Sequence, residues 1–573
     1  MSNRRTFFFY VIPSVLSFAL SGIYAIVDVF FVGNSIGDAG LSAINIAYPI
    51  TAVLIATGTG IGMGGAVKYS ILKAGGHEER ARDYAAEAIW MMLFFSVLLT
   101  GSFYVMSERL LSALGAYGKL LVLGKEYTTV IILGTVLQVF GTGMVPLMRN
   151  YGGAMWSMIA MICGFATNVT LDYILVWVLN WGMYGAALAT VIGQGATMAV
   201  ALVYCAAKKK LFLKMTSGDM GVRALQIVKI GLAPFGLTLA PEISLVIINR
   251  FSASYGGQRA IATYACISYV ICIIYLLLQG VGDGSQPLMS QFYGAGQGKN
   301  LKETKKLAYK SSMAIAVIGG ILMYLLRGQI GVLFGSSPEV NAEIIMVMPI
   351  FLLSLPADAI TRVTSAAFYA TEKSVWSYVL ILSEPVITLV LVMILPPLFG
   401  GQIMIWWSSV AAKIATAVVG IALSVFVRTQ KGHEMKLSKE FERIVLRWKS
   451  MGLVGLKFEY IGYGSEHMIL LLHVKNEEYC LECMKGDEIY EADVTKNLDV
   501  FCQGLQEMNI NEWNCRHFES LVSLFPGFSW NLSVTTSEIH VACDGRDIFP
   551  PNWSEFCDLL HRLGMSELKD SFF

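Results

Sequence analysis

The sequence predicts an all-α polytopic membrane protein with twelve transmembrane helices in two six-helix lobes, plus a small α+β C-terminal domain. Of the 573 residues, 55% are hydrophobic and only 14% are charged, whereas a soluble domain carries about 25% charged residues. Charge is divided unevenly, because residues 1–430 sum to +10 and residues 431–573 sum to −9. This composition disfavours a soluble enzyme, a disordered chain and a nucleic-acid-binding domain, so we expect no nucleic-acid partner.

Twelve apolar stretches are each long enough to cross a bilayer, which takes about 20 residues. The first follows Arg4 and Arg5, as in a signal peptide, but it is too long for one and lacks a small-residue cleavage site. We therefore expect it to be a retained helix. The predicted spans lie at roughly 7–32, 42–70, 86–107, 127–150, 156–179, 183–207, 225–252, 260–291, 307–328, 343–369, 375–396 and 402–427.

Lys and Arg are concentrated in alternate loops. If the N-terminus is cytoplasmic, the loops on that side include two strongly basic ones, at 208–223 and 299–310. The positive-inside rule then predicts a multi-pass protein of the cell membrane with both termini in the cytoplasm. Since cytosolic thiols rarely pair, we expect the cysteines of the C-terminal domain to be reduced.

The membrane part matches itself at an offset near 220 residues, which predicts two parallel repeats of six spans. Paired repeats of this kind are typical of transporters whose substrate site lies between the halves. The expected domains are an N-terminal lobe (1–207), a cytoplasmic inter-lobe loop (208–223), a C-terminal lobe (224–430) and a soluble cytoplasmic domain (431–573). The matching pairs are Pro13 with Pro234, Asp28 with Asn249, Gly60, Gly62 and Gly64 with Gly280, Gly282 and Gly284, Ser70 with Ser290, Gly76 with Gly296, and Trp156 with Trp376.

Two features within the spans have a structural interpretation. The glycine-rich run at 58–65 lacks the Gly-Lys-Ser/Thr ending of a phosphate loop and lies in an apolar span, so we expect close helix packing there. Pro13 and Pro234 also lie within spans, where proline kinks a helix, and both are candidate hinges.

Polar side chains inside the N-terminal lobe form one candidate site. Asn168 and Asp172 are four residues apart and share one face of a helix, while Asp28 and Thr190 lie in the same lobe. Their oxygen atoms suit Na⁺, and a pair of buried carboxylates also suits H⁺. The alternative is four separate residues, each satisfied by its own neighbours, and spacing alone leaves both interpretations open.

The C-terminal lobe carries further charged residues within its spans. Asp358 and Arg362 are four residues apart, and we interpret them as neutralising each other. Glu384 and Lys413 are expected to pair likewise. We also expect a substrate cleft lined by methionine and aromatic side chains, with weak candidates at Met63, Met144, Met148, Met289 and Tyr293.

Several of these segments resemble the multidrug and toxic-compound extrusion (MATE) family over about residues 7–428. The similar segments are Ile23–Gly33, Asn168-Val-Thr-Leu-Asp172 and Gly284-Ser-Gln-Pro287 with Tyr293-Gly-Ala-Gly296. The resemblance implies a transporter, not an enzyme, whose two lobes open alternately to the two sides of the membrane. It also implies antiport, in which a Na⁺ or H⁺ gradient drives export of an organic, often cationic, small molecule. No cofactor other than the coupling ion is expected.

The resemblance assigns residues to two possible ion sites. One branch of the family binds its coupling cation in the N-terminal lobe, at positions matched by Asp28, Asn168, Asp172 and Thr190. Another branch uses a Glu in the seventh of the twelve spans, eight residues after a Pro, and an Asp in the tenth span. Glu242, eight residues after Pro234, and Asp358 match these and are candidates for cation or substrate binding. The chain departs from the family at Pro241, and we rank the N-terminal lobe first.

Two other functions are considered. A flippase for lipid-linked saccharides belongs to the same superfamily, but it needs a cationic cavity and the membrane half offers few buried basic residues. A membrane sensor or scaffold that signals through its C-terminal domain would bind ligand without gradient-driven flux.

Residues 431–573 extend beyond the resemblance and predict a separate α+β domain that binds an unknown cytoplasmic partner. Helical periodicity occurs at 438–450, 496–508 and 552–563, and alternating patterns predict strands at 453–462, 467–474, 478–484, 529–535 and 538–543. Cys480 and Cys483 are weak zinc candidates, because residues three apart on a strand face opposite sides and no second pair of this spacing exists. No metal site is therefore expected.

Overall fold

The computed structural model describes most of the chain as two compact units, Met1–Val425 and Phe426–Phe573. We describe each unit by itself. The described residues are 3–215, 220–334, 336–451, 454–461, 467–475, 478–485, 488–508, 510–513, 517–519, 529–536, 540–546, 549–550 and 553–563.

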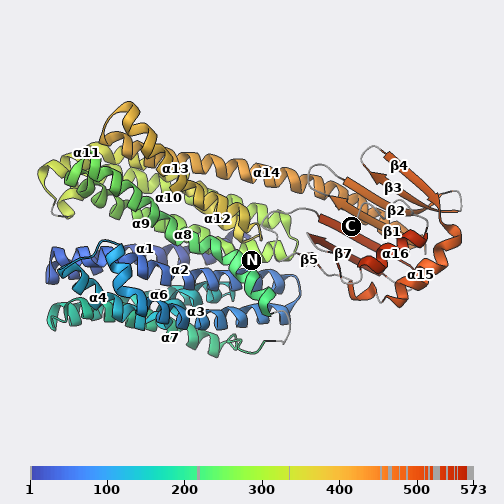
Figure 1. Ribbon diagram of the computed structural model, residues 1–573, viewed down its shortest axis with the longest axis horizontal. Coiled ribbons are helices and arrows are strands. Elements are labelled where there is room, and N and C mark those ends of the chain that lie inside the picture. Colours follow the sequence, from blue (N-terminus) through green and yellow to red (C-terminus); the bar gives the residue numbers. More distant parts are fainter. Residues whose placement is uncertain are drawn as a thin grey trace. The chain divides into compact units, whose positions relative to one another are not determined.

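The first unit consists of long helices arranged in two lobes (Figure 1). Among the described residues, ten helices are long and apolar enough to cross a membrane, and the number is twelve if each of two bent helix pairs is one span. The predicted fold class is confirmed, with ten of the predicted spans as continuous helices and two as bent pairs. The N-lobe holds α1 (Asn3–Ile36), α2 (Asp38–Ala74), α3 (Glu78–Ala113), α4 (Lys119–Leu133), α5 (Thr135–Asn150), α6 (Ala154–Leu171), the π-helix η1 (Asp172–Val178) and α7 (Gly182–Ala207). The C-lobe holds α8 (Met220–Tyr255), α9 (Gly257–Gly294), α10 (Gly298–Leu333), α11 (Pro338–Leu352), α12 (Leu355–Tyr369), α13 (Ser374–Phe399) and α14 (Gln402–Met451).

The internal repeat is visible in the helix boundaries. Helices α3, α5, α6 and α7 start at residues 78, 135, 154 and 182, and their counterparts α10, α12, α13 and α14 start at 298, 355, 374 and 402. Each pair is 220 residues apart, the offset that the sequence predicts. The loop glycines Gly76 and Gly296 both have positive φ, +88° and +66°, a conformation that glycine adopts without steric cost.

Two spans that the sequence predicts as single helices are broken at equivalent places. Helices α4 and α5 meet at 60° around Gly134, and α11 and α12 meet at 45° before Leu355. A Cβ at Gly134 would lie 2.5 Å from the side chain of Val191, so only glycine allows this approach. The Ser354 hydroxyl at the second break donates to the Phe351 carbonyl at 2.8 Å. An apolar pattern reveals neither contact, because the first depends on a neighbouring helix and the second on a single hydroxyl group.

The glycine repeat brings the two lobes into contact. We call the end of the lobes where α1 begins and α2 ends the proximal end, and the opposite end the distal end. In the proximal halves of the helices, a Cβ at Gly60 would lie 2.8 Å from the Gly231 carbonyl oxygen of α8. A Cβ at Gly280 of α9 would likewise lie 2.7 Å from the Cα of Val15 in α1. The predicted role of this run in close helix packing is confirmed.

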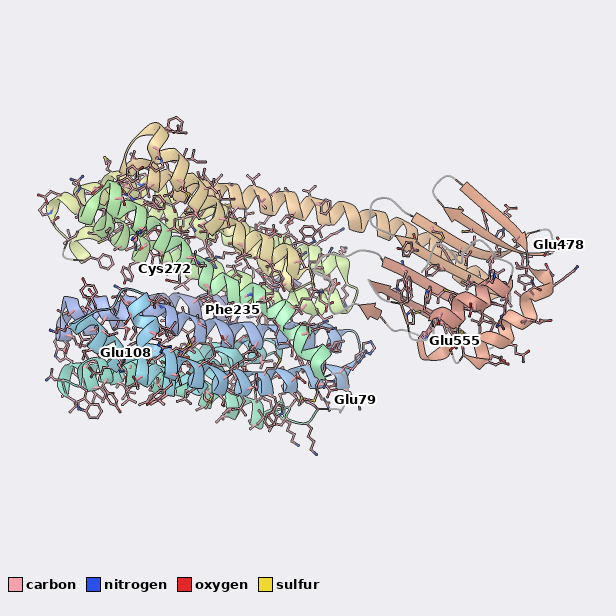
Figure 2. All side chains as sticks on the ribbon, in the orientation of Figure 1. Glu79, Glu108, Phe235, Cys272, Glu478 and Glu555 are labelled. Carbon is pink, nitrogen blue, oxygen red and sulfur yellow. The ribbon has the colours of Figure 1, made fainter. Side chains whose placement is uncertain are left out.

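At the distal end, each lobe has its own core. One buried cluster, which runs from Val32 to Val191, contains only N-lobe residues, and another, from Ile248 to Val410, contains only C-lobe residues. Buried clusters at the proximal end instead contain residues of both lobes. In one of them, Met63 and Val67 of the N-lobe pack with Ile230 of the C-lobe. Figure 2 labels Cys272, which is exposed, on the side of the C-lobe that faces the N-lobe. The lobes are therefore closed at the proximal end and separate at the distal end.

The second unit is a mixed sheet with helices α15 (Leu498–Glu507) and α16 (Trp553–Leu563) packed on it. The strand order is β4-β3-β2-β1-β6-β7-β5, antiparallel except between β5 and β7. Alternate residues of β1, Leu456 and Phe458, enter the core beside Trp530 of β6 and Trp553 of α16. The strands are β1 (Gly455–Ile461), β2 (His467–Lys475), β3 (Glu478–Lys485), β4 (Glu488–Asp493), β5 (His517–Glu519), β6 (Ser529–Thr535) and β7 (His540–Arg546).

The predicted helices and five predicted strands of this unit are confirmed. Edge strands β4 and β5 were not predicted, since β4 is rich in charged residues and β5 has only three residues. Cys480 and Cys483 lie on opposite faces of β3, and Cys483 belongs to the apolar core. Among the described residues, no group of three or more His, Cys, Asp or Glu side chains could hold a metal ion.

Candidate functional site

The four predicted ligands of the N-lobe come from three neighbouring segments. Asp28 lies in α1, Asn168 in α6, Asp172 at the start of the π-helix η1 that continues α6, and Thr190 in α7. Asn168 and Asp172 are buried, with 2% and 0% of their surface exposed. Helices α6 and α7 approach closely because Gly193 lies directly against the Cβ of Asn168.

The structure brings the two carboxylates together. The carboxyl groups of Asp28 and Asp172 lie close enough to interact electrostatically. Within the described part of the chain, both Asp172 oxygens, one Asp28 oxygen and both amide atoms of Asn168 are buried without a protein hydrogen-bond partner. Buried polar atoms are almost always paired, so unpaired atoms gathered in one place indicate a ligand.

The chemistry of this group follows from its charge. Two ionised carboxylates this close repel each other in a buried position, and a shared proton or a bound cation removes the repulsion. The amide oxygen of Asn168 adds a third hard oxygen of the type that alkali and alkaline-earth cations prefer. The arrangement is one that can hold either a proton or a small cation.

Tyr127 of α4 completes the N-lobe group and was missed in the sequence. Its hydroxyl interacts with the side chains of Thr190, Asp28 and Asp172. The Thr190 hydroxyl also donates to the Ala186 carbonyl at 3.1 Å. Tyr127 gives no signal in sequence, because a tyrosine in an apolar span is common and its partners are more than 40 residues away.

The π-helix connects the ion site to α1. A π-helical segment is rare and is often found at functional sites. Here it begins at Asp172 and runs to Val178, and the Ser35 hydroxyl of α1 donates to its Val176 carbonyl at 3.0 Å. The rings of Phe30 and Trp177 stack 6.3 Å apart. The distal half of α1 therefore contacts the segment that starts with Asp172.

The predicted hinge prolines lie in continuous helices. Pro13 and Pro234 are internal to α1 and α8. In each helix, a hydroxyl four residues later donates to the proline carbonyl, from Ser17 at 2.7 Å and from Thr238 at 3.1 Å. The hinge role of these prolines stays a prediction.

The C-lobe candidates are separate from one another. Asp358 of α12 is buried, and its carboxylate lies 3.1 Å from the Lys413 ammonium of α14. Glu242 of α8 forms no ion pair among the described residues and interacts electrostatically with Tyr48 of the N-lobe and Tyr269. No described hydrogen bond or ion pair joins Glu242 to Asp358.

Asp358 does not pair with Arg362, contrary to the interpretation from spacing. The Arg362 guanidinium donates instead to the Gln279 side chain at 2.8 Å. The geometric reason is that Lys413 and Gln279, on neighbouring helices, reach closer than a residue on the same helix does. The expected pair of Glu384 and Lys413 is confirmed, at 2.9 Å.

Two polar contacts across the lobes were not predicted. Arg149 of α5 lies 3.9 Å from Asp283 of α9, and both side chains are almost fully buried. The Asn150 and Gln286 amides exchange hydrogen bonds of 2.9 and 3.2 Å across the same interface. Asp283 also accepts from Tyr369 at 3.0 Å. These contacts close the proximal end with a buried polar network.

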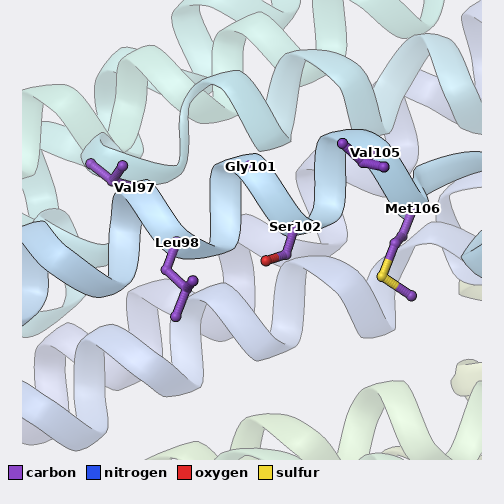
Figure 3. Close-up of a pocket in the computed structure, with 6 residues that line it drawn as sticks. All are labelled: Val97, Leu98, Gly101, Ser102, Val105 and Met106. Carbon is purple, nitrogen blue, oxygen red and sulfur yellow. The ribbon is translucent and has the colours of Figure 1, made fainter.

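The methionines expected in a cleft pack in cores instead. Met63, Met144, Met148 and Met289 are at most 1% exposed. One surface pocket lies along α3, and all six of its lining residues come from that helix (Figure 3). Most of them are strongly exposed, including Val97 and Val105 at 63% and 82%. This pocket contains none of the candidate ion ligands.

Comparison with known proteins agrees with this geometry. The MatE family model matches residues 13–174 and, a second time, residues 234–394. The two matches together cover more than half of the chain, and each covers one copy of the internal repeat. The multidrug export protein MepA of Staphylococcus haemolyticus is 23% identical over 405 residues, which is 70% of this chain and 89% of that protein.

Solved structures show the same fold. An outward-facing MATE family transporter of the MOP superfamily aligns with a TM-score of 0.71 and 21% identity, over 76% of this chain and 97% of that chain. A MOP superfamily transporter from Pyrococcus furiosus, described as having a binding pocket of reverse polarity, aligns with a TM-score of 0.70 and 20% identity, over 74% and 96% of the two chains. The repeat, the twelve spans and the double family match together show that this chain belongs to the MATE family of transporters.

Proposed function

We propose that the protein is a Na⁺- or H⁺-coupled antiporter that exports organic, cationic and amphipathic small molecules by alternating access of its two lobes. The coupling ion binds in the N-lobe at Asp28, Asn168, Asp172 and Thr190. The observation that supports this proposal is the proximity of the Asp28 and Asp172 carboxylates, of which three oxygen atoms are buried without a protein hydrogen-bond partner among the described residues. The name of the MepA relative, a multidrug export protein, supports the substrate class.

The mechanism follows from the contacts of the ion site. When a bound cation or a shared proton lowers the charge of the Asp28 and Asp172 pair from −2 to −1, the repulsion between α1 and η1 is reduced, and the contact of the distal half of α1 with η1 is stabilised. Exchange of one monovalent cation for one monovalent cationic substrate moves no net charge, so the concentration gradient of the coupling ion drives export, at about 1.4 kcal/mol per tenfold ratio. Each additional cation that enters adds about 2.3 kcal/mol per 100 mV of membrane potential. Glu242, half-buried in α8 and unpaired among the described residues, is proposed to face the cationic substrate.

We further propose that the protein resides in the cell membrane with both termini in the cytoplasm. The basic loops support this orientation. The closed proximal end then faces the cytoplasm, and the lobes are separate toward the outside. The acidic C-terminal unit is proposed to bind a cytoplasmic partner.

The test is efflux of a fluorescent organic cation from proteoliposomes under an imposed Na⁺ or H⁺ gradient. We expect one gradient to drive flux in the wild type and Asp28→Asn to lower it at least tenfold, since the variant removes one of the two charges that hold the ion. Glu108→Gln is the matched control, because Glu108 pairs with Lys125 at the exposed surface of the N-lobe.

Two outcomes contradict the proposal. Equal flux in the wild type and Asp28→Asn would place coupling elsewhere, and no flux under either gradient would favour the flippase or the sensor. A flippase needs free positive charge for a pyrophosphate. The buried Arg149, Arg362 and Lys413 each have an acidic or amide partner in the described structure, which argues against it.

A further inference from the structure

Lys413 lies at the centre of a buried acidic cluster in the C-lobe. Its ammonium nitrogen is 3.1 Å from a carboxylate oxygen of Asp358 and 2.9 Å from one of Glu384. It also lies 4.4 Å from the ring centre of Tyr275. The three charged side chains are 12%, 3% and 17% exposed. Four helices (α9, α12, α13 and α14) each contribute one residue to this cluster.

The cluster has no counterpart in the N-lobe. At the repeat offset of 220, Lys413 corresponds to Gly193, Glu384 to Gly164 and Asp358 to Gln138. A Cβ at Gly164 would lie 2.9 Å from the carbonyl oxygen of Gly193. The N-lobe thus has a close helix contact where the C-lobe has a salt bridge, so the charged cluster is an addition specific to one repeat.

The N-lobe candidate ligands likewise have no acidic counterparts in the C-lobe. The N-lobe ion ligands correspond in the C-lobe to residues without a carboxylate, namely Asn249, Thr388, Val392 and Val410. Moreover, no described basic side chain forms an ion pair with Asp28 or Asp172. Asp28 and Asp172 therefore have no fixed counter-charge among the described residues, whereas Asp358 and Glu384 of the C-lobe share one.

We infer that Lys413 is a tethered counter-ion that occupies the cation position of the C-lobe acids, so that Asp358 and Glu384 hold no exchangeable coupling ion. A lysine ammonium is a compact charge with three donors. Here it contacts two carboxylates and the face of an aromatic ring. Ion exchange is then confined to the N-lobe. This inference rests on the proposed antiport and specifies which lobe performs the coupling.

The test removes the ammonium and asks whether a free cation replaces it. In Lys413→Gln, the two carboxylates face each other without a counter-charge, as Asp28 and Asp172 do in the N-lobe. We expect the thermal midpoint of the purified full-length protein to rise with NaCl by at least about 2 °C more than that of the wild type. N-methylglucamine chloride at equal ionic strength separates ion binding from screening.

The matched control is Lys413→Gln combined with Asp358→Asn. This double variant has the net charge of the wild-type cluster but only one carboxylate, so we expect its response to Na⁺ to equal that of the wild type. If the single variant responds to Na⁺ no more than the double variant does, the C-lobe acids are not a latent cation site and the inference is wrong.

A second measurement decides the case if Lys413→Gln does not fold. Equilibrium binding of radioactive Na⁺ is compared in the wild type, Asp28→Asn and Asp358→Asn, with Lys413 intact. We expect the same number of bound ions in the wild type and Asp358→Asn. A lower number in Asp358→Asn would overturn the inference. Neither measurement involves transport, so the inference about Lys413 can be tested even if the efflux assay shows no flux.

Discussion

The buried ion pair between Arg149 and Asp283 predicts how the two lobes are held closed at the proximal end. The isosteric change Asp283→Asn leaves Arg149 without its counter-charge in a position where the side chain is only 3% exposed. Removing one partner of a buried pair costs about 3–5 kcal/mol. We use the lower value, because the two charged atoms lie 3.9 Å apart. The closed state should therefore lose about 3 kcal/mol, or roughly 100-fold in population, since about 1.4 kcal/mol is tenfold.

The assay is alkylation of a cysteine placed in this interface. Ser14 of α1 is only 2% exposed. It packs closely against α9, because a Cβ placed on Gly284 would lie 2.8 Å from the Cβ of Ser14. In Ser14→Cys, N-ethylmaleimide reaches the thiol only when the proximal end opens, so the rate reports the open population. Mass spectrometry of the labelled peptide distinguishes this cysteine from the ten natural ones. We expect Asp283→Asn to increase the rate roughly 100-fold.

A double variant separates this reasoning from general destabilisation. Arg149→Met combined with Asp283→Asn removes both charges, and replacing a buried pair by neutral groups is often close to neutral in stability. Its alkylation rate should return to within about tenfold of the wild type. An unchanged rate in Asp283→Asn, or equal rates in the single and double variants, would refute the role of this ion pair.

Two further predictions concern packing. Gly64→Val should prevent closure of the proximal end and abolish transport in the efflux assay, because a Cβ at Gly64 overlaps the backbone of α8. The control is Gly101→Ala in α3, where a Cβ has open space and flux should not change. Trp553→Ala should destabilise the C-terminal unit by about 3–5 kcal/mol, because its ring stacks 4.5 Å from that of Phe549 in the apolar core. Limited proteolysis of the full-length chain measures this, with the exposed Val500→Ala as control.

Most of the fold was predictable because the bilayer imposes a condition on each segment separately. A spanning helix must be apolar over a fixed length, so composition alone located all twelve spans. The offset of the internal repeat was also predictable from the sequence. It pairs Gly60 with Gly280, and both glycines make close contacts between the lobes. Two edge strands of the C-terminal unit were missed, β4 because charged residues interrupt its alternating pattern and β5 because it has only three residues.

The sequence named the residues of the candidate site, but not which of them lie together in space; their role as ion ligands stays a prediction. Asp28, Asn168, Asp172 and Thr190 were identified by residue type and resemblance, and the structure places the two carboxylates together. Tyr127 was missed, because nothing local marks a tyrosine as a neighbour of residues in three other segments.

The sequence by itself determined that this protein is a polytopic membrane protein of twelve apolar segments, that its two halves are copies of one unit, and that carboxylate, amide and hydroxyl side chains lie within the spans of the first half. These properties depend on local apolarity and on residue identity. Only the tertiary structure decided that Asp358 contacts Lys413 and not Arg362, and that Arg149 reaches Asp283 across the lobes. The physical reason is that a buried charge pairs with the nearest available partner in space, and helix packing, not sequence spacing, determines which partner that is.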